Sequence, residues 1–293
     1  PVDCRTGKEI VYQNLYSCLE SQYAMIYPRP SKAEILEFYN LDNYYTLKGF
    51  KKGRYVAENL LDKLRIKLAM LFDKSAPDAV KVILSLCPEK STKILDLGCG
   101  GGRLIAELSQ AGYCVTGVEI NPNSQAFQLG LPVYLGSAED IPDQVSQQSF
   151  DVIVMTHVLE HVLEPAVCLE NVSMLLKDDG VFICEVPNNE SIFASSAGIT
   201  WDMLDMPRHL NFFSTKSLTL MLEKCGFKAN TYFYRYFTRE FLNRWIMREA
   251  ETYEKIKASN LPHSPVDKPG PAKAWKVLLK TIFSPPHLKY DSL

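Results

Sequence analysis

The sequence Lys-Ile-Leu-Asp-Leu-Gly-Cys-Gly-Gly-Gly at residues 93–102 decides the fold of this chain. A strand predicted over Thr92–Leu97 runs directly into a glycine-rich loop, and a helix is predicted over Arg103–Ala111. Glycines let a backbone adopt positive φ and approach a ligand closely. The first amides of the following helix and its positive dipole end favour an anionic group. The stretch therefore predicts a ligand-binding loop between a strand and a helix.

Short apolar runs and helices alternate from this loop to residue 186. Further strands are predicted at Val115–Ile120, Val133–Leu135, Phe150–Thr156 and Val181–Val186. Helices are predicted at Ser124–Gly130 and Pro165–Leu176, the latter closed by a turn at 177–180. This alternation predicts an α/β fold: a doubly wound, mostly parallel Rossmann-like sheet covered on both faces. Right-handed crossovers place every loop that follows a strand on one edge, where ligands of such sheets bind.

The flanks of the sheet differ from it in pattern. Residues 1–53 are predicted as an irregular N-terminal arm, 54–237 as the sheet domain and 238–293 as a helical, basic C-terminal extension. In the arm, Ser31 and Glu34 fit a helix capping box.

Two further elements are predicted inside the sheet domain. An amphipathic helix is expected over residues 55–72, with apolar side chains at helical spacing. A late strand is expected over the aromatic run Thr231–Phe237.

Composition excludes several classes of protein. The chain is 46% apolar and 23% charged with a net charge of −2, so no global field recruits nucleic acid. The eight cysteines show no disulfide pattern, and we see neither a signal peptide nor a membrane-spanning run. A cytoplasmic location is therefore expected.

The C-terminal part of the chain is basic. From Lys228 on, it carries 12 lysines and arginines against 6 acids. This extension is suited to weak contact with a membrane surface or an acidic substrate, and the plainer alternative is a solvated helix face.

Two acids beside the glycine loop point to S-adenosylmethionine (SAM). Asp96 would face the ammonium of the methionine moiety, and Glu119, which ends the next strand, can accept bonds from both ribose hydroxyls. The rival is a nicotinamide dinucleotide, whose G-x-G-x-x-G fingerprint requires glycine where Arg103 stands. We therefore predict SAM as the cofactor. The residues expected to bind it are Asp96, Gly98, Cys99, Gly100, Gly102, Glu119, Ile120, Ser137, Ala138, Glu139, Thr156 and His157.

The stretches 94–108, 115–121, 150–162 and 175–187 resemble class I SAM-dependent methyltransferases, in particular ubiquinone-biosynthesis-like and sugar C- or O-methyltransferases. The resemblance implies an enzyme that moves methyl from SAM to a small hydroxylated acceptor: a sugar, a sugar nucleotide or a quinol-like ring. The alternative is a SAM-binding protein without catalysis, in a regulatory or assembly role. The oligomeric state stays open.

The N-terminal arm is similar to that of the sugar C-methyltransferases, which often carry a zinc ribbon ending in C-x-x-C. Here Cys18 matches the first cysteine and Ser21 replaces the second, so we interpret the arm as a ribbon that has lost its metal. The resemblance also places Tyr45 near the cofactor.

Histidines are the candidates for chemistry. His209 lies beyond the fifth strand and matches the histidine that serves as base in the similar sugar C-methyltransferases; His161 is the second candidate. Arg208 could anchor an acidic or hydroxylated substrate, and the insert 188–213 is expected to form a lid or substrate wall.

A metal site is weighed at the run 157–161. Some RNA 3′-end and quinone O-methyltransferases place an E-x-x-E-H metal site near this position. Here His157 replaces the first Glu, and the run itself lacks a third strong ligand. No metal is predicted.

Overall fold

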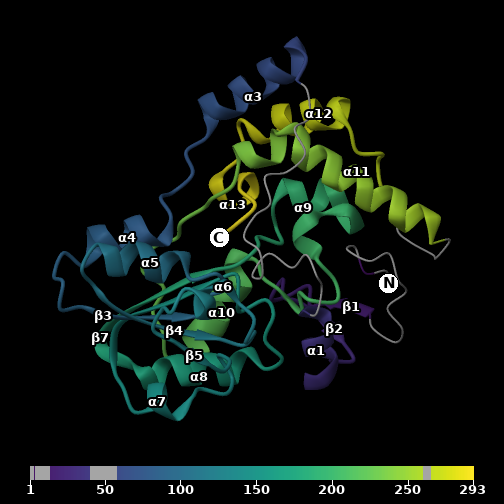
Figure 1. Ribbon diagram of the computed structural model, residues 1–293. Coiled ribbons are helices and arrows are strands. Elements are labelled where there is room, and N and C mark those ends of the chain that lie inside the picture. Colours follow the sequence, from purple (N-terminus) through teal and green to yellow (C-terminus); the bar gives the residue numbers. More distant parts are fainter. Residues whose placement is uncertain (1–2, 4–13, 40–57, 260–264) are drawn as a thin grey trace.

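The centre of the molecule is a five-stranded sheet in the computed structural model, which describes residues 3, 14–39, 58–259 and 265–293 (Figure 1). Its strands run in the order β5-β4-β3-β6-β7, all parallel. They are β3 (Lys93–Leu97), β4 (Cys114–Glu119), β5 (Val133–Leu135), β6 (Phe150–Thr156) and β7 (Leu176–Glu185). The order reverses between β3 and β6, which confirms the doubly wound α/β fold and places the switch point beside the glycine loop.

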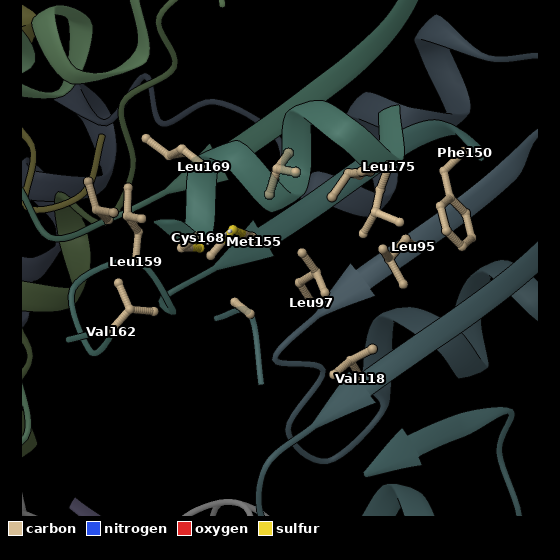
Figure 2. Close-up of a cluster of buried hydrophobic side chains, with 14 of the residues drawn as sticks. Leu95, Leu97, Val118, Phe150, Met155, Leu159, Val162, Cys168, Leu169 and Leu175 are labelled. Carbon is tan, nitrogen blue, oxygen red and sulfur yellow. Dashed lines mark hydrogen bonds between the residues drawn. The ribbon is translucent and has the colours of Figure 1, made fainter. Parts of the chain in front are cut away.

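Alternate residues along each strand point to opposite faces and fill two cores. Ile94 packs with α4 (Ala79–Leu86), α5 (Arg103–Gln110) and α6 (Gln125–Gln128). Leu95 packs on the other face with α8 (Pro165–Leu175) and α10 (Thr215–Lys224); α7 (Asp143–Ser146) also joins this core. Figure 2 shows this second core, where Cys168, Leu169 and Leu175 of α8 lie over Leu95, Leu97 and Met155 of the sheet.

The N-terminal arm forms a small antiparallel sheet with a strand from the insert. It contains β1 (Asn14–Ser17), β2 (Ala24–Tyr27) and β8 (Asn211–Phe212) in the order β1-β2-β8, followed by α1 (Lys32–Tyr39). The capping box before α1 is confirmed, because the amide and hydroxyl of Ser31 donate to the Glu34 carboxylate at 2.7 Å each, and Ser31 Oγ accepts the Glu34 amide at 3.3 Å.

A helical cap lies beside the sheet, at the top of Figure 1. Its members are α3 (Leu60–Phe72), α9 (Ile192–Ala197), η1 (Gly198–Thr200), η2 (Asp202–Leu204), η3 (Thr238–Phe241), α11 (Asn243–Ala258), α12 (Pro271–Thr281) and α13 (Pro286–Lys289). The insert and the C-terminal extension share one core, in which Trp201 packs with Phe237, Phe241 and Leu278. Among the described residues, no helix combines the length and apolar character needed to cross a bilayer.

Two predicted elements near β7 are wrong. The expected turn at 177–180 belongs to β7, which starts at Leu176 and absorbs the extra residues as an irregularity in its pairing with β6. The expected strand Thr231–Phe237 is not formed; only Arg235 makes a bridge, to Ser292. The position beside β7 is taken by the last residues instead, since Val186 and Leu293 exchange both backbone hydrogen bonds at 2.9 and 3.0 Å.

The helix expected over 55–72 is confirmed from Leu60, but its orientation is unusual. Its buried residues are Asp62, Arg65 and Ala69, whereas Leu60, Leu64 and Leu71 are exposed. Leu68, Ala69 and Phe72 still pack in the core of the cap, so hydrophobic spacing predicted the helix correctly but did not indicate that Leu60, Leu64 and Leu71 face away from it.

Candidate functional site

The glycine loop follows β3 and is pinned to β4. The amides of Gly98 and Cys99 donate to the Val118 carbonyl at 2.8 and 3.0 Å. Gly98 has φ +75°, and a Cβ at this position would come within 2.4 Å of Val158. Only glycine fits there, because the loop packs directly against the segment that follows β6. This packing brings the ends of β3 and β6 together at one site.

Two buried carboxylates lie at this edge. Glu119 accepts the Gly100 amide at 2.7 Å and the Asn121 amide at 2.9 Å, and burial raises its pKa. Burial and the nearby charge of Glu119 raise the pKa of Asp96 to about 7. Two buried acids beside a glycine loop suit a ligand with a cationic group and vicinal hydroxyls. This arrangement fits the ammonium and ribose of SAM, so the residues present are consistent with the expected cofactor.

Three other residues that we expect to bind the cofactor lie at the same edge and are held in different ways. Ser137 forms a tight turn with Asp140, and Ala138 is buried behind it. The Glu139 carboxylate accepts the amides of Leu163 and Glu164, so it orders the chain before α8.

Four more residues that we expect to bind the cofactor differ in burial and in which of their atoms can face it. The Cys99 thiol belongs to the apolar core around Ile105, so only its backbone can face a ligand. Gly102 ends the loop as the N-cap of α5. Ile120 is partly exposed after β4, and Thr156 is half-buried at the end of β6. Tyr45 lies outside the described residues.

His157 is held as a cation between two acids. Its Nδ1 lies 3.0 Å from Glu160 Oε1, and its Nε2 lies 3.4 Å from Glu185 Oε1. Burial opposes the charge, but the hydrogen bonds to these two glutamates raise the pKa of His157 to about 10. Its φ is +54°, a conformation that residues other than glycine rarely adopt. The histidine therefore anchors the start of the segment after β6.

Sequence reasoning missed the residues that complete this ion-pair chain. Arg235 donates to Glu185 at 2.7 Å, and Tyr236 stacks on His157 with ring centroids 6.2 Å apart. Both lie in the run that was expected to be a strand. The only available signal was the aromatic and basic composition of that run, which does not specify a partner 50 residues upstream.

His161, His209 and Glu160 form one cluster, in which Glu160 and His209 are buried and His161 is half-buried. The imidazole rings of His161 and His209 meet edge to face with centroids 4.5 Å apart. Glu160 joins them, with one potential ligand atom from each residue lying within 4.8 Å of the others. The backbone holds the segments together, since the Leu210 and Asn211 amides both donate to the Glu160 carbonyl. The fold thus brings the two candidate bases together, 48 residues apart in sequence.

The tautomer of His209 is fixed by its surroundings. Its Nδ1 must donate, because its partner at 2.7 Å is the Met203 carbonyl, which can only accept. Nε2 of the neutral ring then carries the lone pair. Burial and the neighbouring His161 lower the pKa of His209 to about 4, so the ring is neutral near pH 7. A neutral buried imidazole with a defined lone pair can accept a proton or bind a metal ion.

Arg208 does not serve as the expected substrate anchor. Its guanidinium is buried and bonded to Asp3 at 2.6 Å and to Asp205 at 2.9 Å. Its charge is already matched by these two acids, so it ties the insert to the N-terminal arm.

The cluster of Glu160, His161 and His209 could hold a metal ion. The prediction of no metal rests on the lack of a third strong ligand in the run 157–161. The fold brings in His209 as a third potential ligand. The charge balance points the other way, because the carboxylate of Glu160 is already paired with the His157 cation.

The ribbon-like arm keeps a hairpin without a described metal site. Cys18 and Ser21 lie in the turn between β1 and β2, where the Cys18 amide donates to the Tyr23 carbonyl at 2.8 Å. Cys18 is exposed. None of the described cysteines forms a disulfide bond. Among the described residues, the one potential metal-ligand group found is the Glu160 cluster.

Comparisons with known proteins identify the family to which the sheet domain belongs. Residues 63–232 match a family described as a methyltransferase domain. The ubiquinone biosynthesis O-methyltransferase of Cereibacter sphaeroides is 30% identical over 182 residues, which cover 57% of this chain and 69% of the relative. That of Maricaulis maris is 34% identical over 131 residues, which cover 41% of this chain and 51% of the relative.

Several solved structures are similar to part of the chain. A SAM-dependent methyltransferase from Thermotoga maritima is 25% identical, with 57% of this chain and 74% of that chain covered and a TM-score of 0.43. The family match starts at residue 63, so it gives no support to a zinc ribbon in the arm.

The family match spans more than half of the chain and includes the glycine loop, both buried acids and the segment after β6. SAM rather than a nicotinamide dinucleotide as the cofactor, and a methyltransferase as the class of enzyme, are thereby confirmed. The chain belongs to the class I SAM-dependent methyltransferases.

Proposed function

We propose that this enzyme methylates a hydroxyl group of a small acceptor, with a quinol-like ring as the first candidate. The observation that carries the proposal is the cluster of His161, His209 and Glu160, which starts two residues after Val158, the residue that packs against Gly98 of the glycine loop. Transfer to a hydroxyl oxygen requires removal of one proton, and this cluster offers a proton acceptor. The relatives from Cereibacter and Maricaulis, which are named ubiquinone biosynthesis O-methyltransferases, support the choice of a quinol-like ring.

The residues divide the work in a simple way. The cofactor supplies the methyl group on a sulfonium, which is already activated for transfer. The glycine loop, Asp96 and Glu119 hold and orient the cofactor. His209 Nε2 takes the hydroxyl proton as the oxygen becomes nucleophilic, and the carboxylate of Glu160 stabilises the imidazolium that forms. Orientation of the acceptor in line with the methyl group supplies much of the remaining rate.

The acceptor class is tested with SAM labelled on its methyl carbon. Purified enzyme is incubated with catechols, quinols, sugars and sugar nucleotides, and labelled products are identified by mass spectrometry. O-methylated quinols or catechols would support the proposal. Turnover on sugars alone would correct the acceptor, and SAM binding without turnover on any of these would favour a non-catalytic, SAM-binding role.

Cofactor affinity is expected to rise with pH. In the free protein the pKa of Asp96 is about 7, and a bound ammonium favours its ionised form. Binding therefore releases a proton below pH 7, and affinity increases as pH rises through that value. For S-adenosylhomocysteine we expect a change on the order of tenfold between about pH 5.5 and 7.5, measured by calorimetry. Asp96→Asn should bind more weakly with a flat profile; an unchanged slope in that variant would assign the titration to another group.

Turnover is expected to survive chelation. The charge of Glu160 is matched by His157, which leaves the cluster little net attraction for a divalent ion. Enzyme treated with EDTA and dialysed should keep its activity, and elemental analysis should find well below one zinc per chain. Activity that is lost on chelation and restored by added Mg²⁺ or Zn²⁺ would instead make the cluster a metal site.

A further inference from the structure

Helix α3 is attached to the molecule through the buried polar pair Asp62 and Arg65 and through Leu68, Ala69 and Phe72, which pack in the core of the cap. Arg65 is fully buried, its Nε donates to the Phe241 carbonyl at 3.1 Å, and its guanidinium bonds to Asp62 at 2.8 Å. Asp62 also accepts a bond from Asn243 at 3.0 Å. These contacts with η3 and α11 fix the rotation of α3 about its own axis. The opposite, leucine-rich side of α3 therefore points away from the protein.

Three leucines share the outward side of α3. Leu60, Leu64 and Leu71 are 81%, 47% and 73% exposed, and their spacing places them on one face of the helix. Lys63 and Lys67 are exposed beside them. Scattered exposed leucines are ordinary on a protein surface, but a row of them opposite a buried ion pair is not.

Helix α12 continues this surface. Figure 1 shows α3 and α12 side by side, and the rings of Phe72 and Phe283 meet with centroids 6.5 Å apart. Leu279 and Phe283 are 62% and 89% exposed on the outer side of this pair. Lys276 and Lys280 are also exposed. We call the exposed sides of the two helices, with Phe283, the α3–α12 surface.

We propose that the α3–α12 surface binds a lipid bilayer that carries anionic headgroups. Leucine and phenylalanine side chains can enter the boundary between headgroups and acyl chains, while long lysine side chains reach the phosphates. The exposed residues of α3 and α12 include four lysines and no carboxylate. A symmetric second copy would bring these lysines against one another, so charge favours an anionic bilayer over self-association. The sequence predicts weak membrane contact through the basic C-terminal extension, and α3 adds exposed apolar side chains to that contact.

The test is co-sedimentation of the full chain with vesicles. Phosphatidylcholine vesicles are compared with vesicles of two parts phosphatidylcholine to one part phosphatidylserine. Binding is expected on the anionic vesicles and should weaken with added salt. Lys63→Glu and Lys276→Glu should each lower partitioning by about fivefold or more, and Leu71→Glu by about tenfold. Matched controls are Lys228→Glu and Met174→Glu, which change exposed residues elsewhere and should bind like the wild type.

Wild-type SAM binding in each variant separates a loss of vesicle binding from misfolding, and it does not depend on which acceptor the enzyme methylates. All five variants should retain wild-type SAM binding and turnover, because none lies at the cofactor edge. Equal binding of wild type and Leu71→Glu to anionic vesicles would overturn the proposal. So would a wild-type dimer in sedimentation velocity that Leu71→Glu dissociates, since a second copy would then cover the surface.

Discussion

His209→Ala is expected to lower turnover by about 10²–10⁴ and to leave SAM affinity near its wild-type value. The ring lies in the segment that packs on the loop after β6, and Met203 fixes its tautomer so that Nε2 accepts the proton. A base whose free pKa is about 4 is weak by itself. The charge of Glu160 raises the pKa of His209 without outweighing burial, so the ring works as a base through its fixed tautomer and its position rather than through strong basicity.

Two measurements separate catalysis from structure in this variant. Turnover is measured with the acceptor found by the labelling experiment, and SAM binding by calorimetry. A structural histidine would lower stability and cofactor binding together, whereas a base changes turnover alone. His287→Ala is a matched control, since His287 is exposed in the cap. A His209→Ala enzyme that keeps more than a third of wild-type turnover would exclude His209 as the base and direct attention to His161.

The sheet and its cofactor edge could be predicted because their signals are local. Each strand is an apolar run of a few residues, and Val133–Leu135 and Phe150–Thr156 were bounded correctly. Asp96 and Glu119 follow from position alone, since Asp96 lies one residue before the end of β3 and Glu119 ends the neighbouring parallel strand β4. Backbone geometry then brings them to one edge whatever the rest of the chain does.

The ion pairs around the segment after β6 could not be predicted, because each depends on a contact between distant parts of the chain. His157 was placed at the site, but its pairing with Glu185 and the support from Arg235 require the observed packing of β7. The same holds for Glu160, the acid of the run 157–161, because its cluster with His161 forms only when the fold brings in His209 from the insert.

The strand at 231–237 failed for a related reason. Its aromatic residues have high β propensity, but propensity does not choose a partner. Ser292 takes the place beside Pro187, and Arg235 is left with a single bridge to Ser292. Apolar spacing likewise cannot say which side of a helix meets the core, and α3 shows the limit, because a buried Arg65 outweighs its leucines. Substitution of this buried arginine tests how α3 is attached to the rest of the cap.

Arg65→Ala is expected to destabilise the protein by about 3–5 kcal/mol, because Asp62 stays buried without its countercharge. Arg65 also bonds to Asn243 and to the Phe241 carbonyl, so its loss removes contacts of α3 with α11 and η3 and leaves the bond from Asn243 to Asp62. The midpoint of urea unfolding should fall accordingly, with SAM binding retained in the absence of denaturant. The double variant Asp62→Asn/Arg65→Met should recover a large part of the loss, because no uncompensated charge remains. If the single variant loses less than about 1 kcal/mol, Asp62 must be reached by water, and the rotation of α3 is set by its apolar contacts instead.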